Sequence, residues 1–326
     1  MKLTSMAVLA LSLTPALALA EANQTNVINK NGNSVMFVSK DDLAKTKNYW
    51  TEDRLNKATP KESPEITEQE IEKMKKEKTP LVNPKIIAKP FSPKNALHTP
   101  AKADSPTEAD VNEYPFSTAG KLYFTEGDGS EHSCSAQFVA SNVLLTAAHC
   151  VRDKETGEYY TNFKFHHGYR KGEEKDKIYG VSAATRSSWV VGGGEDTNRK
   201  VDYGFIITET ESQLGWLGVE IGFNYDDFYA IGYPSNYSDG KVLQQVNGHN
   251  AGVEDGVAAM SNNPYGSGAS GGAWIVDKED GGYAIGNNAS HKHDDPNTDY
   301  GPYYDSKFES LYDEVASQAA KLRIKK

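Results

Sequence analysis

The sequence predicts an all-β body of short antiparallel strands that ends in a single helix. Between 114 and 285, short apolar or alternating runs recur between Gly, Asn and Asp residues, a pattern typical of barrels or sandwiches. These runs are 120–124, 135–139, 143–146, 163–165, 205–208, 228–231, 242–246, 273–276 and 283–285. The end of the chain changes to a helical period, and Ser306–Glu309 fits a capping box. One helical face carries Phe308, Leu311, Tyr312, Val315, Ala319 and Leu322.

The N-terminus has the features of a secretory signal peptide. A basic start is followed by the nearly continuous apolar stretch 7–20, which ends in small residues at Ala18 and Ala20. The apolar run is shorter than the roughly 20 residues that span a bilayer, which favours a signal peptide over a membrane anchor. We therefore expect residues 1–20 to be removed, the mature chain to be secreted and extracellular, and no membrane association after removal.

Residues 21–112 differ in composition from residues 113–326. They are rich in Lys and Glu, carry few large apolar side chains and are interrupted by prolines, so they cannot form much core. The prolines are Pro60, Pro64, Pro80, Pro84, Pro90, Pro93, Pro100 and Pro106. We interpret 21–112 as a pro-segment or flexible N-terminal arm, with a processing site within 101–113, ahead of a domain at 113–326. One short helix is expected over Glu65–Lys78, with Ser63 as its N-cap.

The charge and the cysteine content argue against nucleic-acid binding and against a zinc site. The formal net charge of −10 would repel polyanions, so we expect no nucleic-acid partner. The only two cysteines, Cys134 and Cys150, lie in a chain expected to be exported, and we expect them to be bonded. A loop of about 15 residues gives roughly 3 kcal/mol in the chain-entropy model. A zinc site needs more ligands than this pair supplies, so we expect no metal. We also expect no cofactor and a monomeric protein.

Three short motifs carry residue types suited to nucleophilic catalysis. His149 follows the apolar run 143–148 and precedes Cys150, whose half-cystine would hold the histidine loop. Asp202 stands at the start of an apolar run, where burial would require a partner such as the His149 Nδ1–H. Ser270 lies in the glycine-rich stretch 266–272, where glycines allow a sharp turn that aims backbone N–H groups at one point.

The order His149, Asp202, Ser270 and the residues around each resemble the motifs of chymotrypsin-like (trypsin-like) serine proteases. The resemblance covers roughly Glu113 to Lys326 and implies two six-stranded antiparallel β-barrels with a C-terminal helix. It also implies hydrolysis of protein or peptide substrates through an acyl-enzyme, with Ser270 as nucleophile, His149 as general base and Asp202 orienting the histidine. The Gly268 and Ser270 amides are the implied oxyanion hole. Cys134 lies where the family places the partner of Cys150.

The chain departs from the trypsin branch at two positions. Ala269 replaces the aspartate that pairs with the new N-terminal amine in trypsin-like zymogens, so that switch cannot operate. Pro264 stands where tryptic enzymes carry an acidic pocket residue, so cleavage after Lys or Arg is not supported. The chain is most similar to the glutamyl-endopeptidase-like branch, although Asn288 stands where that branch has a histidine. Pro264, Asn288 and Ser290 are the candidate pocket residues.

The sequence also admits three alternatives. Residues 268–272 fit the G-x-S-x-G pattern of α/β-hydrolases, but that fold orders its triad Ser, acid, His and needs a helix after the serine. Asp196 rivals Asp202 but lies in the polar stretch 192–200. A catalytically inactive, protease-like secreted binding protein stays open as the alternative function.

Overall fold

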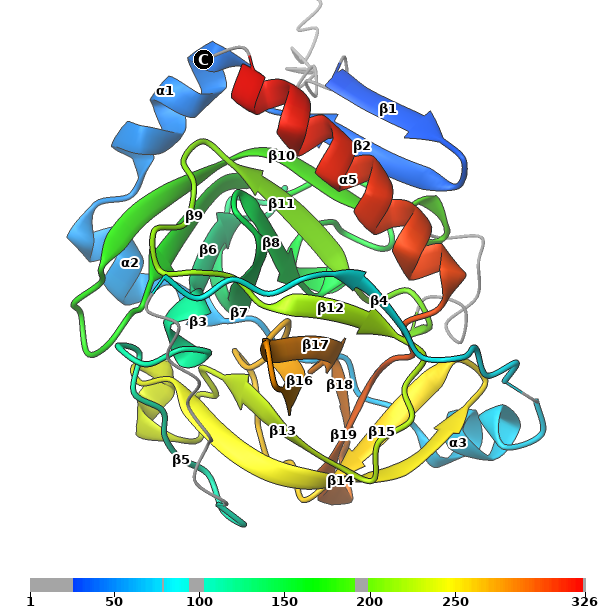
Figure 1. Cartoon of the computed structure of the whole chain (residues 1–326). Coiled ribbons are helices and arrows are strands. Elements are labelled where there is room, and N and C mark those ends of the chain that lie inside the picture. Colours follow the sequence, from blue (N-terminus) through cyan, green and yellow to red (C-terminus); the bar gives the residue numbers. More distant parts are fainter. Residues whose placement is uncertain (1–25, 78, 94–102, 191–198, 325–326) are drawn as a thin grey trace, which may run out of the picture.

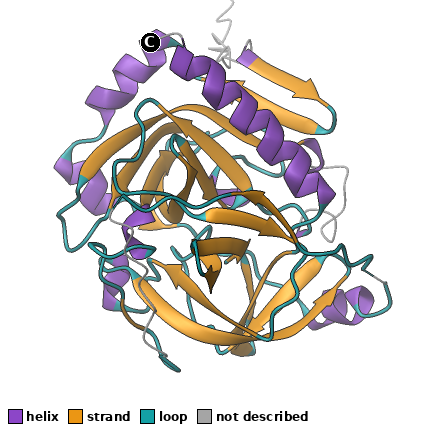
Figure 2. Cartoon of the chain, viewed as in Figure 1, coloured by secondary structure: helices purple, strands orange, loops and turns teal. Residues whose placement is uncertain are grey.

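Two large β-sheets make up most of the molecule, with the helices at its periphery (Figures 1 and 2). The structure is a computed structural model that describes residues 26–77, 79–93, 103–190 and 199–324. The predicted signal peptide, 1–20, and the rival aspartate Asp196 lie outside the described residues.

The first sheet closes into a six-stranded antiparallel barrel. Its strands follow the order β10-β11-β8-β7-β6-β9, and β9 pairs back onto β10. They are β6 (Ala119–Thr125), β7 (Glu131–Ala140), β8 (Val143–Thr146), β9 (Thr161–His167), β10 (Asp176–Arg186) and β11 (Gly204–Thr208). Leu122, Phe138 and Ile206 are fully buried at its centre, since alternate residues of each strand point inward.

The second sheet follows the order β18-β19-β15-β14-β13-β16-β17-β12. Its strands are β12 (Gly218–Ile221), β13 (Asp227–Gly232), β14 (Gln244–Glu254), β15 (Val257–Ser261), β16 (Ala273–Lys278), β17 (Gly281–Asn287), β18 (Ser290–Lys292) and β19 (Asp295–Pro302). Trp274 is the largest of its fully buried side chains. One-turn helices join described strands at η2 (Phe116–Thr118), η3 (Ala148–Cys150), η4 (Ser187–Trp189) and η5 (Ser238–Gly240). The predicted all-β fold with a C-terminal helix is confirmed. No pairing among the described strands closes the second sheet as β9 and β10 close the first, and we call it the second barrel below because it matches the second barrel of the predicted fold.

The N-terminal segment forms ordered elements that extend both sheets. Strands β2 and β4 pair with β10 and β12, β5 pairs with β14, and β3 runs parallel to β7. The elements are β1 (Val27–Lys30), β2 (Asn33–Phe37), α1 (Lys40–Tyr49), α2 (Glu52–Lys57), β3 (Thr59–Pro60), α3 (Glu68–Met74), β4 (Lys85–Ala88) and β5 (Thr107–Glu108). The segment is held by backbone pairing to the barrels, which explains how it is ordered with so few apolar side chains.

The short helix predicted over Glu65–Lys78 exists as α3 but starts later. Thr67 is its N-cap and forms a full capping box with Glu70. The prediction that Ser63 caps this helix is wrong, because residues 63–66 lie outside the helix and the Ser63 hydroxyl contacts the Ser270 hydroxyl.

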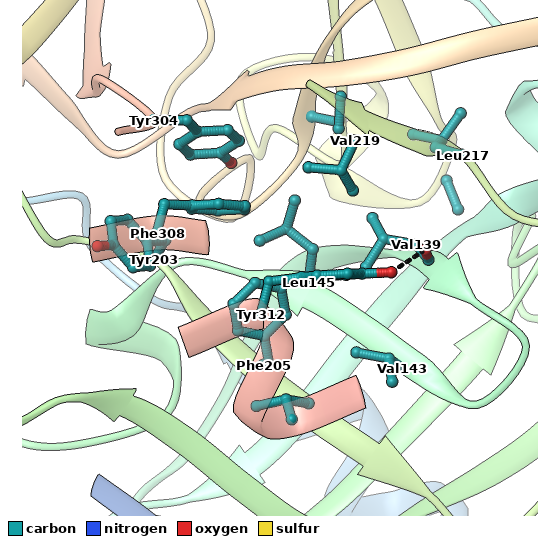
Figure 3. Packing of buried hydrophobic residues seen from close by; sticks show 14 of the residues in the cluster. Val139, Val143, Leu145, Tyr203, Phe205, Leu217, Val219, Tyr304, Phe308 and Tyr312 are labelled. Atoms are coloured by element: carbon teal, nitrogen blue, oxygen red, sulfur yellow. Dashed lines mark hydrogen bonds between the residues drawn. The ribbon is translucent and has the colours of Figure 1, made fainter. Parts of the chain in front are cut away.

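The predicted C-terminal helix is α5 (Ser306–Ile324), which lies across the first barrel (Figure 1). Phe308 stacks on Tyr304 with ring centroids 3.7 Å apart and meets Tyr203 edge-on, as Figure 3 shows. The Asp305 carboxylate accepts from the Lys307 and Phe308 amides, so Asp305 caps the helix where a Ser306–Glu309 box was expected. Among the described helices, none is both long and apolar enough to cross a membrane.

Candidate active site

His149 and Asp202 come together because the strands beside them are paired. Thr146, the last residue of β8, pairs with Gly204, the first residue of β11. His149 follows β8 and Asp202 precedes β11, so the antiparallel register places both at the same end of the barrel. Both residues are buried.

Both carboxylate oxygens of Asp202 bind His149. Oδ1 accepts from the His149 backbone N–H at 3.0 Å, and Oδ2 lies 2.8 Å from the ring Nδ1. A carboxylate only accepts, so the proton of a neutral imidazole is held on Nδ1 and Nε2 keeps its lone pair. Among the described residues Nε2 is buried without a hydrogen-bond partner. The ring is therefore oriented for Nε2 to take a proton.

Ser270 sits in a loop that only glycines can form. Gly268 and Gly271 have φ angles of +89° and +84°, in the left-handed region. A Cβ on Gly271 would lie 2.1 Å from the Thr146 Oγ1, and one on Gly272 would lie 2.0 Å from the Ile231 carbonyl oxygen. The loop is thus pressed directly against both barrels.

Ser135 and Gln137, on β7 of the first barrel, clamp this loop. The Ser135 N–H donates to the Ser270 carbonyl at 2.9 Å, and its hydroxyl donates to the Gly268 carbonyl at 2.8 Å. The Gln137 side chain donates to the Gly271 carbonyl and accepts from the Ala273 N–H. Neither residue was predicted to have a role in the site. Their alternation as buried polar residues within an apolar strand is the signal that could have found them.

The second barrel supports the histidine pair from the other side. Asn287, the last residue of β17, donates from Nδ2 to the Asp202 carbonyl at 3.1 Å, and its Oδ1 accepts from the Tyr304 hydroxyl at 2.7 Å. Asp299 on β19 is also buried, and its Oδ1 accepts from the Ala289 N–H at 3.1 Å. Burial raises the pKa of Asp299 well above its ordinary value, and the nearby Asp202 charge adds to that rise despite the opposing hydrogen bond from Ala289.

The three candidate pocket residues lie in different settings, and Asn288 is the one that contacts the loop directly. The Asn288 amide donates to the Ile231 and Ala269 carbonyls and accepts from Asn263 and Trp274, which occupies all of its groups. Ser290 accepts from Arg199 at 2.9 Å. The Pro264 carbonyl accepts from Asn236. Asn288 therefore holds neighbouring loops together, and its amide has no hydrogen-bonding group left for a ligand.

Cys134 and Cys150 form a disulfide that joins β7 to the one-turn helix carrying His149. Together with His149, the two sulfurs are the one close cluster of metal-ligand types found in the described residues. Sulfurs in a disulfide are not thiolates, so this cluster lacks the donors that zinc requires.

A depression of about 600 Å³ opens beside His149. Tyr160 and Trp189 line it from the first barrel and Ser267 from the second, together with residues 61–65 of the N-terminal segment. The Ser63 and Ser270 hydroxyl oxygens lie 3.0 Å apart, and the Gly268 N–H donates to the Lys61 carbonyl at 3.1 Å. His149, Asp202, Ser270 and the Gly268 amide thus lie around one region between the barrels.

Comparison with family models and with curated proteins gives one partial match. The family model described as Trypsin matches residues 107–206, which include His149 and Asp202 and end before Ser270. No curated protein matches the sequence.

Solved structures of proteases share the fold. Protease Anisep from Arthrobacter nicotinovorans superposes with a TM-score of 0.57 at 24% identity, covering 65% of this chain and 99% of that one. The thermostable serine protease AL20 from an extremophilic microorganism gives 0.52 at 26% identity, covering 62% and 97%. A Glu endopeptidase in complex with MPD gives 0.55 at 21% identity, covering 66% and 97%. The chain is thus similar to chymotrypsin-like (trypsin-like) serine proteases, through the matched family model over residues 107–206 and through the fold that it shares with solved proteases.

Proposed function

We propose that the chain is a secreted serine endopeptidase that uses His149, Asp202 and Ser270 as its triad. The observation that carries this proposal is the His149–Asp202 pair, which in the neutral imidazole leaves the Nε2 lone pair free, without a partner among the described residues. Ser63, which contacts the Ser270 hydroxyl, lines the same depression as His149. Nucleophile and base would thus act on one bound carbonyl.

The chemistry follows from these positions. The Ser270 Oγ forms a bond to the substrate's carbonyl carbon while its proton passes to His149 Nε2. The negative charge that develops on the carbonyl oxygen is held by the Gly268 and Ser270 amides. The C–N bond then breaks, the amine leaves with the proton from His149, and water releases the acyl group by the same steps. Protein or peptide substrates suffice, and no cofactor takes part.

The domain boundaries belong to the same proposal. Residues 1–20 would be a signal peptide, 21–112 a pro-segment and 113–326 the protease domain. The disulfide between Cys134 and Cys150 supports an oxidising, extracellular location. We propose a monomer with no membrane association after signal removal.

Replacing the nucleophile tests the proposal. The chain is nicked with thermolysin, a chelator stops that metalloprotease, and hydrolysis of labelled casein is measured. Ser270→Ala should lower turnover on the order of 10⁶-fold, the loss that removing the nucleophile causes in subtilisin. Ser317→Ala, an exposed change on α5, is the matched control and should keep wild-type activity.

Two results would count against the proposal. Casein hydrolysis that survives in Ser270→Ala would show that another group is the nucleophile. A wild-type chain that stays inactive both before and after nicking would favour the alternative, a catalytically inactive secreted binding protein on a protease fold.

A further inference from the structure

Part of the N-terminal segment crosses the candidate active site. We call Thr59–Met74, which includes β3 and α3, the cleft segment. Its two ends lie on opposite sides of the view in Figure 1, and the stretch between them passes the nucleophile. This stretch is ordered, and Ser63 and Ile66 within it are buried.

Backbone hydrogen bonds attach the cleft segment to both barrels. On the first barrel, β3 pairs in parallel with β7, and the Lys61 N–H donates to the Ser133 carbonyl at 2.9 Å. On the second, the Ile66 N–H donates to the His291 carbonyl at 2.9 Å, beside a parallel bridge between Glu65 and His291. Main-chain pairing to an exposed strand is how extended peptides commonly bind proteins, so the segment occupies a peptide-binding groove.

At the nucleophile, the cleft segment presents a hydroxyl group. The Ser63 Oγ lies 3.0 Å from the Ser270 Oγ, and Ser270 is 0% exposed. The carbonyl that faces the Gly268 amide belongs to Lys61, two residues earlier. Acyl transfer needs one carbonyl group with its carbon at the nucleophile and its oxygen at the amide donors. In the cleft segment the group at the nucleophile belongs to Ser63, whereas the carbonyl oxygen at the amide belongs to Lys61. No single carbonyl meets both requirements, so the segment fills the site without being positioned as a substrate.

An apolar anchor and an ion pair hold the segment in place. Ile66 joins Ile71 and Met74 of α3 in a small core with Val257 of β15. On the same helix, Glu70 lies 3.0 Å from the Arg199 guanidinium, which also donates to the Glu65 carbonyl. Both partners of the Glu70 pair are largely buried, so the charges are poorly screened.

We propose that the cleft segment is an intramolecular inhibitor that keeps the intact chain latent by occupying the peptide groove in a non-productive register. This inference rests on the proposed function, because it assigns a regulator to the same site. The switch it describes needs no N-terminal amine and therefore suits a chain with Ala269 before the nucleophile. Activity would appear once the segment leaves the groove.

Charge reversal on α3 tests the inference in the full-length chain. A fluorescent fluorophosphonate probe is added, and the rate of covalent labelling is measured. In Glu70→Arg, two like charges would face each other at Arg199, and labelling should be at least about tenfold faster than in wild type, because the rate follows the open fraction. Glu72→Arg, an exposed position on the same helix, should label at the wild-type rate.

A second pair of variants tests the apolar anchor. Ile66→Asp would place a charge in the small core and should also accelerate labelling about tenfold or more. Leu81→Asp makes the same chemical change at a side chain that is 66% exposed in the same N-terminal segment, and it should leave the rate unchanged.

Adding the cleft segment back as a peptide shows whether a variant labels faster because the segment has left the groove or because the fold is damaged. A synthetic peptide of residues 58–76, added to the Glu70→Arg chain, should restore slow labelling and remain uncleaved by mass spectrometry, whereas the same peptide carrying Ile66→Asp should not. The inference is overturned if wild type labels as fast as both open variants, if the peptide has no effect, or if it is cut within 59–66. In those cases labelling at Ser270 would still support the triad. A lack of labelling in every form, nicked chains included, would instead overturn the proposed function.

Discussion

Asp202 uses each of its two oxygens on a different group of His149, which fixes both the backbone and the ring of the histidine. The sequence motifs predicted which residues would pair, because an aspartate before an apolar strand and a histidine after one need partners when buried. They could not predict Ser135 or Gln137, whose roles depend on the loop from the second barrel reaching β7. The sequence likewise suggested that Asn288 is a pocket residue, because it does not reveal the four hydrogen-bond partners that occupy the amide.

Asp299 allows a prediction about pH at the residue scale. Its pKa in the folded chain is raised above the ordinary value of 3.8, so the native state holds a proton that the unfolded chain has already lost. The unfolded state then binds fewer protons, and the free energy of unfolding falls as the pH rises from about 4 through the raised pKa. Asp299→Asn, which can still accept from Ala289, should remove this fall and be more stable than its parent at pH 8.

The comparison uses urea unfolding of chains that also carry Ser270→Ala, which prevents self-digestion. The stability difference between parent and Asp299→Asn should shrink toward zero as the pH falls from 8 to below 4, because Asp299 of the unfolded chain then regains its proton and is neutral in both states. A difference that is constant with pH would contradict the assignment of Asp299 as the buried, protonated carboxyl.

At the scale of elements, the helices α3 and α5 were predicted to within about one turn, whereas α1 and α2 were not predicted. The apolar period 308–322 identified α5 because its apolar face packs on the first barrel. The N-cap of α5 is Asp305 and that of α3 is Thr67, and both differ from the predicted caps because several short polar residues near each helix start can cap it. The strands β1, β3 and β4 escaped prediction because none of their residues is fully buried, and β2 because it depends on pairing with the distant strand β10.

The stability of α5 should depend mainly on Phe308. The ring is fully buried, stacks on Tyr304 and packs on Tyr203, the neighbour of Asp202 (Figure 3). Phe308→Ala should cost about 3–5 kcal/mol of unfolding free energy in urea, the usual range for a buried phenylalanine. The exposed Ser317→Ala on the same helix should change it by less than about 0.5 kcal/mol. A loss below about 1 kcal/mol in Phe308→Ala would mean that the helix is held by other contacts.

At the scale of the whole molecule, two barrels face each other across a site that a third part of the chain fills. Composition indicated that 21–112 could not form a core of its own, and the structure shows the described part of it bound to both sheets. This pairing joins residues that are far apart in the sequence, so no local sequence pattern predicts it. The resemblance to chymotrypsin-like proteases covered the barrels and left the N-terminal segment without a role.

The central claim, that Ser270 is a nucleophile activated by His149, can be tested by mapping one covalent adduct. The chain nicked by thermolysin is treated with a fluorophosphonate, digested, and sequenced by mass spectrometry. We expect a single adduct on Ser270 in wild type and almost none in His149→Ala, because the hydroxyl needs a base to attack. An adduct on another residue, or equal labelling of Ser270 without His149, would contradict this claim.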